Sequence, residues 1–264
     1  MEEGRFQRRK DCISIVMPVY HARDSVGAAM DSVRAQTWRD WELLLVLDGC
    51  TDGTEKVVEA YCRQARDQRI RVIRQPRNLG AARARNRGIE EAEGRYLAFL
   101  DADDLWMEEK LEKELAFLKK TGAAFAFTGY EFADRNGRGT GKVVRVPPVL
   151  TYGQALKNTT IFTTTVMFDR AKIGEGLLKM PEIKSEDTAL WWKLLRNGYE
   201  AHGLDENLAL YRRQGNTLSA NKAEAIRRIW GLYRKAENLS APRSLYYFCF
   251  WAVRAVGRRL GRKL

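Results

Sequence analysis

The chain has 264 residues, of which 45% are hydrophobic and 30% charged, and a formal net charge of +12. This length suits one large domain or two small ones, and the balance of apolar and charged residues excludes an intrinsically disordered chain. The four cysteines are scattered without a CxxC pair, and the chain has only two histidines. A disulfide framework and a zinc site are therefore not expected, and a reducing, cytoplasmic environment is favoured.

No segment is predicted to act as a secretory leader or to span a membrane. Residues 1–12 are charged and contain no apolar core of a signal peptide. The longest apolar run lies at 245–253, whereas a helix needs about twenty apolar residues to cross a bilayer.

Strands and helices alternate in the N-terminal part of the chain. Short apolar runs predict strands at 13–20, 41–49, 69–76 and 95–101, and helical spacing predicts helices at 24–36, 54–65 and 80–92. This order indicates βαβ units and a parallel sheet, and the continuous apolar runs indicate strands covered on both faces. Ligands of such sheets bind beyond the carboxyl ends of the strands. Tyr20, Asp48 and Asp101 stand at those ends, and we expect the site there.

The same reading continues with less regular spacing after residue 101. Helices are predicted at 104–120 and 185–199, strands at 123–132 and 159–169, and a glycine-rich turn or mobile loop at 134–142. Ser185 is the expected N-cap of its helix, and Asn197-Gly198 is expected to end it.

Three carboxylates stand at the end of the fourth predicted strand and just after it, namely Asp101, Asp103 and Asp104. Carboxylates this close repel one another unless a cation lies between them. Asp104 is expected to start the next helix, but capping needs one acid rather than three. Oxygen ligands favour Mg²⁺ or Mn²⁺, and magnesium held by one or two carboxylates usually shares its coordination with substrate phosphates. The stretch therefore predicts a metal site for a phosphorylated ligand, although neither a P-loop nor a GxGxxG motif follows the first strand.

Five segments occur in an order that is more specific than any one of them. They are SIVMPVY (14–20), LLLVLDGCTDGT (43–54), NLGAARARNRGI (78–89), YLAFLDADDLW (96–106) and SEDTALWWKLL (185–195). Together they closely resemble family 2 glycosyltransferases of the GT-A fold, over about residues 13–217.

The resemblance implies a fold class and a domain plan. The fold would be α/β, with a GT-A (Rossmann-like) mixed, mainly parallel sheet flanked by helices. Residues 1–205 would form the glycosyltransferase domain, in which 11–110 bind the nucleotide sugar and 111–205 bind the acceptor. Residues 206–264 would be a basic, helical C-terminal extension.

The resemblance also implies which residues hold the nucleoside of the donor. They are Pro18, Val19 and Tyr20 at the end of the first strand and Asp48 at the end of the second. After the second strand the family usually has two acids followed by glycine and serine. In this chain Leu47 replaces the first acid, Asp48 is the second, and Cys50 replaces the serine. The donor is expected to be a UDP-sugar.

Further donor contacts are implied by the third and fourth segments. Gly80 and Arg85 belong to the stretch that resembles the family motif N-x-G-x-x-x-A-R-N-x-G, where a helix N-terminus and an arginine suit an anion. Asp101-Ala102-Asp103 takes the place of the DxD motif. Asp103 is then the more direct ligand of Mg²⁺ or Mn²⁺, and Asp101 supports the ribose and the metal, which neutralises the departing diphosphate.

The remaining implied roles lie late in the chain. Asp187, in a Glu-Asp pair that resembles the family's ED motif, would be the general base that deprotonates the acceptor hydroxyl, so that attack opposite the nucleotide inverts the anomeric carbon. The alternative is that both acids simply favour a helix N-terminus. Arg212 is implied to reach the diphosphate, and Gln214 stands where the family often has a histidine. Trp191 and Trp192 are expected in the acceptor pocket or the core.

Positive charge is concentrated in the last part of the chain. Residues 205–264 contain thirteen Lys and Arg but four Asp and Glu. Residues 244–264 combine aromatic and apolar residues with a basic end, which suits a helix lying in the interface of an anionic membrane. We expect a cytoplasmic protein held at the inner face of the membrane, where lipid-linked glycan acceptors occur. A homodimer contact is the alternative explanation for this apolar segment. Residues 222–239 also have a helical pattern, and they could simply pack on the domain.

The sequence thus predicts an inverting, metal-dependent transfer of a sugar from a nucleotide sugar to a glycan or lipid-linked glycan, in bacterial surface polysaccharide or lipopolysaccharide synthesis. Three alternatives are weighed against it. A nucleic-acid-binding module is disfavoured because no basic stripe interleaves with aromatic residues in the body of the chain. A sugar-1-phosphate nucleotidylyltransferase is disfavoured because the glycine-rich loop expected after its first strand is absent from this sequence. An inactive glycan-binding relative is disfavoured because Asp101, Asp103 and Asp187 are intact.

Overall fold

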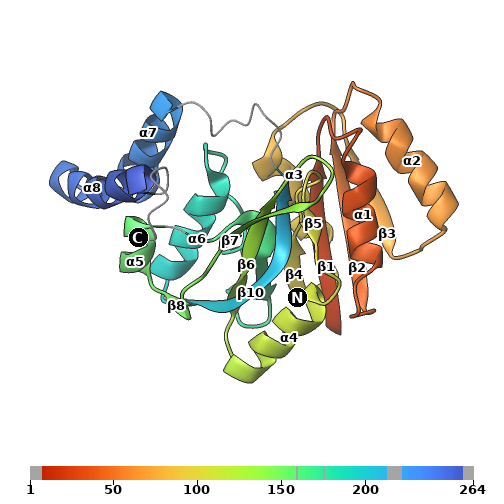
Figure 1. Cartoon of the computed structure of the whole chain (residues 1–264), viewed down its shortest axis with the longest axis horizontal. Coiled ribbons are helices and arrows are strands. Elements are labelled where there is room, and N and C mark those ends of the chain that lie inside the picture. Colours follow the sequence, from red (N-terminus) through yellow and green to blue (C-terminus); the bar gives the residue numbers. More distant parts are fainter. Residues whose placement is uncertain (1–7, 159, 175, 213–221, 258–264) are drawn as a thin grey trace, which may run out of the picture.

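The computed structural model describes residues 8–158, 160–174, 176–212 and 222–257. These residues form a ten-stranded sheet with the strand order β3-β2-β1-β4-β9-β6-β10-β5, with β7 beside β6 and β8 beside β10. Helices flank the sheet (Figure 1). The mixed α/β fold class is confirmed.

The described strands are β1 Arg9–Val19, β2 Trp41–Asp48, β3 Ile70–Gln75, β4 Gly94–Phe99, β5 Leu105–Trp106, β6 Phe125–Ala133, β7 Gly139–Val144, β8 Val149–Leu150, β9 Val166–Asp169 and β10 Ala201–Arg212. The described α-helices are α1 Val26–Arg34, α2 Thr54–Ala65, α3 Ala81–Glu91, α4 Lys110–Thr121, α5 Tyr152–Lys157, α6 Glu186–Arg196, α7 Lys222–Gly231 and α8 Ala241–Gly257. A 3₁₀ turn, η1 Thr163–Thr165, precedes β9, and a π-helical turn, η3 Leu232–Ala236, follows α7.

The parallel half of the sheet places the site. The chain builds β1, β2 and β3 in one direction and then returns to β4 on the other side of β1, and these four strands are parallel. Loops at the carboxyl ends of β1 and β4 therefore diverge and leave a crevice where ligands of such sheets bind. On the other side of β4 the sheet becomes antiparallel. There β9 pairs with β4 in the antiparallel direction, and β6 pairs with β9 in the same way.

Two apolar layers cover the sheet, as the continuous apolar strands predict. All eight residues of β2 are buried, and successive side chains point to opposite faces. Leu44 packs in the layer that includes α3, α5 and α6, whereas Leu43 and Leu45 pack in the layer that includes α1, α2 and α4. The strands are thus shielded on both sides.

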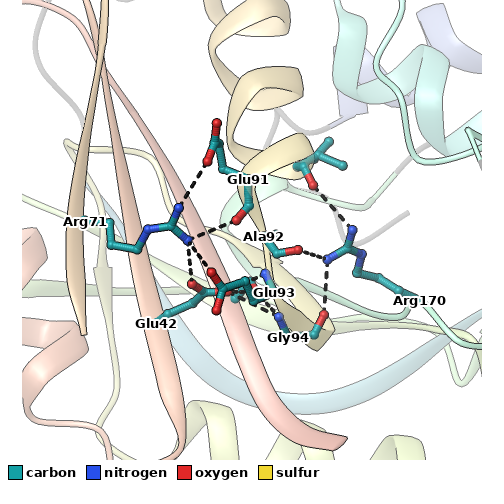
Figure 2. Close-up of polar contacts among 9 residues, drawn as sticks. Glu42, Arg71, Glu91, Ala92, Glu93, Gly94 and Arg170 are labelled. Atoms are coloured by element: carbon teal, nitrogen blue, oxygen red, sulfur yellow. Dashed lines mark hydrogen bonds and ion pairs between the residues drawn. The ribbon is translucent and has the colours of Figure 1, made fainter. Parts of the chain in front are cut away.

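A polar network holds the amino-terminal ends of the parallel strands, at the edge opposite the predicted site (Figure 2). The buried Glu42 carboxylate accepts hydrogen bonds from the Glu93 amide at 2.7 Å and from Arg71 Nη1 at 3.3 Å. Arg170 Nη1 donates to the Ala92 carbonyl at 2.7 Å, directly after α3. A cation at this position stabilises the helix end. The sheet is therefore fixed at the edge that carries no site residue.

Several predicted elements differ from the structure. Residues 139–144 form the exposed strand β7 rather than part of a turn or loop. The strand predicted at 159–169 is shorter than expected, because of its described residues, 160–169, only 166–169 are in a strand. Strand β10 was not predicted, because its residues alternate irregularly between buried and exposed and its pairing with β6 contains bulges. It crosses the expected boundary at 205/206, so residues up to 212 belong to the sheet.

The C-terminal helices pack beside α5 and α6 (Figure 1). Ile229, Leu232 and Tyr233 are buried in the core layer that contains α6. The packing on the domain that was considered for residues 222–239 is thus found for only part of the segment, because Ile226 and Trp230 are exposed. Among the described residues, no helix has the length and hydropathy needed to cross a bilayer.

Candidate functional site

The end of β1 presents an exposed aromatic ring at the carboxyl edge of the sheet. Pro18 and Val19 lie in the strand, and Tyr20 follows it with 46% of its surface exposed. The Tyr20 ring stacks on His21 with the ring centroids 3.9 Å apart. The Val19 carbonyl accepts a hydrogen bond from Cys50 Sγ at 3.3 Å, which ties the β1 end to the loop after β2. This places the first predicted nucleoside residues beside those of the second segment.

Asp48, at the end of β2, is buried and fixes the loop before α3. Its two carboxylate oxygens accept hydrogen bonds from the Leu79 amide at 2.7 Å and from the Gly80 amide at 2.9 Å. Gly49 has a φ of +65°, and a Cβ there would lie 2.4 Å from the Arg77 backbone. The Asp48-Gly49 pair is therefore a tight junction between two loops, and the contact of Asp48 with a nucleobase stays a prediction.

The residues of the third segment hold α3 against its neighbours. Gly80, at the N-cap of α3, has a φ of +91°, a conformation that favours glycine. The buried Asn86 side chain donates to the Met180 carbonyl at 2.9 Å and accepts from its amide at 2.8 Å. A Cβ on Gly88 would lie 2.4 Å from Val16 Cγ1. Helix α3 thus touches β1 directly and holds the segment that leads into α6.

Arg85, buried on α3, joins the two halves of the site. Its Nη2 donates to Asp101 Oδ1 at 2.5 Å, and its Nη1 donates to Glu186 Oε1 at 2.8 Å. Burial alone would lower the pKa of the guanidinium, but the charges of Asp101 and Glu186 raise it above its ordinary value. Among the described residues its buried Nε has no hydrogen-bond partner. Arg85 therefore links the end of β4 to the start of α6 through two ion pairs, and its contact with the donor stays a prediction.

Asp104 does not start a helix, contrary to the prediction. Helix α4 begins at Lys110, and the short strand β5 lies between them. Asp104 is fully buried and accepts hydrogen bonds from Thr164 Oγ1 at 2.7 Å and from the Arg212 amide at 3.2 Å. Burial and then the charges of Asp101 and Asp103 raise its pKa well above the ordinary value. The third acid therefore anchors the loop rather than capping a helix.

Arg212 holds the same loop from the end of β10. Its buried guanidinium donates through Nε to the Asp103 carbonyl and through Nη2 to the Ser25 carbonyl at 3.1 Å. Burial lowers the pKa of Arg212, and the nearby Asp104 and Asp103 oppose this. Arg212 thus positions the acidic loop, and a contact with the diphosphate stays a prediction. Gln214 lies outside the described residues.

The two acids of the predicted metal site suit a cation that shares its coordination with the substrate. Burial and then the charge of Asp101 raise the pKa of Asp103. This repulsion is what a bound cation relieves. No group of three or more potential metal-binding side chains converges within the described ranges. The carboxylates of Asp101 and Asp103 therefore fit Mg²⁺ or Mn²⁺ with phosphate and water as the other ligands, rather than an all-protein metal site.

Asp187 lies in the first turn of α6, beside Glu186. Its Oδ2 accepts a hydrogen bond from Thr163 Oγ1 at 3.0 Å, and its Oδ1 accepts from the Thr188 amide at 2.6 Å. Ser185 occupies the N-cap position as predicted, but its side chain makes no capping bond and its φ is +60°. Such a conformation in a non-glycine residue is strained and often occurs at functional sites.

The sequence did not predict the 3₁₀ turn η1. Thr163 bonds to Asp187, and the next residue, Thr164, bonds to Asp104. Neighbouring hydroxyls thus orient one acid on α6 and one after β4. The run of three threonines was the available signal, but threonine is typical of strands, and a strand was predicted there.

A cavity of about 430 Å³ contains the acids from both halves of the site. Asp101, Arg85 and Asp187 line it. Trp192 also lines it, whereas Trp191 is fully buried in the core. The predicted residues that do not line this cavity are Pro18, Val19, Tyr20, Asp48, Gly80, Ala102, Asp103 and Arg212.

The remaining wall of the cavity comes from the C-terminal helices. Arg228 and Ile229 of α7 and Trp251 of α8 line it. The predicted division into a catalytic domain and a separate extension had given these helices no part in the site. Their aromatic and basic residues at helical spacing were visible in the sequence, but not which face turns inward.

The comparison with known families decides between the alternatives. The family model described as Glycosyl transferase family 2 matches residues 14–173, which is more than half of the chain. The chain belongs to glycosyltransferase family 2. It is accordingly a transferase enzyme, and the nucleotidylyltransferase and nucleic-acid-binding alternatives are set aside.

Two relatives are similar to this family 2 glycosyltransferase over most of its length. A protein of Bacillus subtilis strain 168, provisionally named as the teichuronic acid biosynthesis glycosyltransferase TuaG, is 41% identical and is matched over 95% of this chain and 98% of its own. The Escherichia coli protein WfgD, named UDP-Glc:alpha-D-GlcNAc-diphosphoundecaprenol beta-1,3-glucosyltransferase, is 35% identical over 83% of each chain.

Solved structures share its fold. Staphylococcus aureus TarS residues 1–349, solved with UDP-GlcNAc, superposes with a TM-score of 0.69 at 21% identity, over 96% of this chain and 76% of TarS. The mannosyltransferase PcManGT of Pyrobaculum calidifontis, solved with GDP-Man and Mn²⁺, gives a TM-score of 0.67 at 16% identity with the same coverage. This glycosyltransferase therefore has the GT-A fold that was predicted.

Proposed function

We propose that this family 2 enzyme transfers a sugar from a nucleoside-diphosphate donor to a hydroxyl of a glycan acceptor in bacterial surface polysaccharide synthesis. The observation that carries the proposal is one cavity that contains both Asp101, from the predicted donor edge, and Asp187, from the start of α6. The names of TuaG and WfgD support the polysaccharide and the lipid-linked acceptor. The UDP-GlcNAc complex of TarS and the name of WfgD support a UDP-sugar.

In this proposal the donor lies along the edge formed by Tyr20, Gly80 and the acidic loop. Asp101 and Asp103 would hold Mg²⁺ or Mn²⁺, which supplies a Lewis acid for the departing diphosphate. Arg212 keeps the loop of Asp103 in place through the backbone contacts described above. The nucleoside is then at the β1 side of the crevice and the anomeric carbon faces the cavity.

Asp187 acts on the acceptor. Its carboxylate, oriented by the hydroxyl of Thr163, takes the proton of the acceptor hydroxyl as this oxygen attacks the anomeric carbon. The neighbouring Glu186 is paired with Arg85 and is thus less available as a base. Attack from the face opposite the nucleotide inverts the anomeric configuration.

A donor screen tests the proposal. Purified enzyme, a panel of UDP-, GDP- and dTDP-sugars, and a GlcNAc-diphosphate-alkyl acceptor are expected to give acceptor-dependent nucleotide release with one donor class, stimulated by Mn²⁺ or Mg²⁺ and abolished by EDTA. Asp103→Asn should remove the metal stimulation, because one of the two carboxylates is lost. Absence of metal-dependent binding of every sugar nucleotide, measured by calorimetry, would refute the proposal.

We further propose that the enzyme is held at the inner membrane surface by its C-terminal helices. Exposed apolar side chains cluster there, namely Ile226, Trp230, Leu245, Tyr246, Phe250 and Val253. The basic character of residues 205–264 matches an anionic lipid surface. A lipid-linked acceptor would be presented at the same surface.

Vesicle sedimentation tests the membrane contact. The enzyme should bind phosphatidylglycerol vesicles more tightly than phosphatidylcholine vesicles, and Leu245→Ser with Val253→Ser should weaken binding at least about tenfold, since two apolar side chains are lost from the interface. Val143→Ser, at an exposed position of β7, is the control. If the wild type sediments as a dimer and the double variant as a monomer, with no difference on vesicles, the face is a dimer contact instead.

A further inference from the structure

The cavity has a charged group that the proposed transfer does not use. Arg228 of α7 lines it together with Asp101, Glu186 and Asp187. Its Nε is buried and, within the part of the chain that the structure describes, has no hydrogen-bond partner. A buried donor without a partner costs free energy comparable to a lost hydrogen bond. The buried Nε is itself out of reach of a ligand, but Arg228 lines the cavity, so the rest of its guanidinium can donate to an acceptor oxygen of a ligand.

The other charged groups of the cavity are already paired. Arg85 is bonded to Asp101 and Glu186, and Asp187 to the hydroxyl of Thr163. Glu224, one turn before Arg228 on α7, forms an ion pair with Lys184 Nζ at 2.5 Å. Arg228 is therefore the cationic side chain of the cavity wall with no carboxylate bonded to it among the described contacts.

The cavity lining combines the carboxylates of Asp101, Glu186 and Asp187 with the side chain of Arg228. The carboxylates repel an anion, whereas the neutral acceptor hydroxyl must be deprotonated beside Asp187. Arg228 attracts an anion, and the apolar Ile229 and Leu232 line the same cavity, although Glu224, one turn earlier on α7, also lies within electrostatic range of Arg228. A charge-assisted hydrogen bond is stronger in such a setting than in water. Trp251 adds an aromatic face that suits a sugar ring.

From this arrangement we infer that Arg228 binds an oxyanion of the acceptor while Asp187 receives the acceptor hydroxyl. The inference rests on the proposed function and specifies its acceptor: a glycan with a negatively charged group close to the reacting sugar. That group is the phosphate of a lipid diphosphate carrier or the carboxylate of a uronic acid. Helices α7 and α8, predicted to be an appendage, then form the acceptor subsite.

Ligand binding without a donor tests the inference. Quenching of tryptophan fluorescence reports on the cavity, because Trp192 and Trp251 line it. Three probes share a decyl chain: GlcNAc-diphosphate-decyl, decyl glucuronide and the neutral decyl GlcNAc. The wild type should bind at least one anionic probe more tightly than the neutral one. Whichever anionic probe is preferred identifies the oxyanion as phosphate or carboxylate.

Variants of Arg228 separate its role from packing. Arg228→Gln should weaken binding of the preferred anionic probe about 10- to 100-fold, the loss expected for a hydrogen bond to a charged group, and leave the neutral probe and UDP unaffected. Arg228→Lys should restore part of the affinity. Arg227→Gln removes the same charge from the neighbouring position, which is exposed, and should change nothing.

Three results would overturn the inference. They are equal wild-type affinity for anionic and neutral probes, an equal effect of Arg228→Gln on both, or weaker UDP binding in Arg228→Gln with acceptor binding unchanged, which would assign the residue to the donor. The assay needs neither sugar nucleotide nor turnover. A negative donor screen would therefore refute the proposed transfer without deciding this result, and the two failures are distinguishable.

Discussion

Replacement of Asp187 by asparagine is expected to abolish glycosyl transfer while donor binding is retained. Asparagine preserves the size of the side chain and can still accept the hydrogen bond from Thr163, but it cannot take a proton. General-base catalysis typically contributes about 10²- to 10⁴-fold in rate, so kcat should fall by that factor. Nucleotide release measures the rate, and calorimetry with UDP measures donor affinity.

Two comparisons make the Asp187 result specific. Asp40→Asn makes the same chemical change at the opposite edge of the sheet, where Asp40 pairs with the exposed Arg9, and should leave kcat unchanged. Thr163→Val should lower kcat less than Asp187→Asn, because it only frees the carboxylate to rotate. Normal transfer by Asp187→Asn would show that another group is the base, and a parallel loss of UDP binding would show that Asp187 acts on the donor.

The sequence placed the ends of the parallel strands correctly because each strand has a local signal. The apolar run 95–100 and the acids after it require no information from distant residues, and the same is true of Gly80 at the N-cap of α3 and Arg85 within it. Asp187 was assigned to the same site as Asp101 by the family resemblance rather than by such a local signal. Their meeting in one cavity depends on the strand order, which no local signal shows.

What could not be predicted depends on contacts between distant segments. Asp104 resembled a helix cap, but its partners are Thr164 and the backbone of Arg212, 60 and 108 residues away. Strand β10 is polar and irregular, and its strand conformation depends on pairing with β6, β5 and β8. The inward face of α7 is set by packing of Ile229 and Tyr233 on the core, so the sequence could not show that Arg228 faces the cavity.

Replacement of Arg85 by methionine is expected to destabilise the protein and to inactivate it. Arg85 is the buried partner of two carboxylates, and removal of one partner from a buried ion pair typically costs about 3–5 kcal/mol. Because Asp101 and Glu186 retain 23% and 20% of their side-chain exposure, water offsets part of this cost. A loss near the lower value should reduce Tm by roughly 6–12 °C, measurable by calorimetry or circular dichroism. Arg83 lies on the same helix as Arg85, and Arg83→Met breaks only its exposed ion pair with Glu182. This control variant should have little effect.

The loss of Tm caused by Arg85→Met should also depend on pH in a defined direction. Burial raises the pKa of Glu186, and Arg85 opposes that rise. Without Arg85 the pKa of Glu186 rises further, so the folded variant binds a proton more tightly than the unfolded chain does. Such a group favours the folded state below its folded pKa, and this advantage is lost as the pH rises through that value. The difference in Tm between the variant and the wild type should therefore be larger at pH 7.5 than at pH 5. An equal difference at both pH values would mean that the loss comes from packing, and that the role of Arg85 in holding the end of β4 to the start of α6 is steric rather than electrostatic.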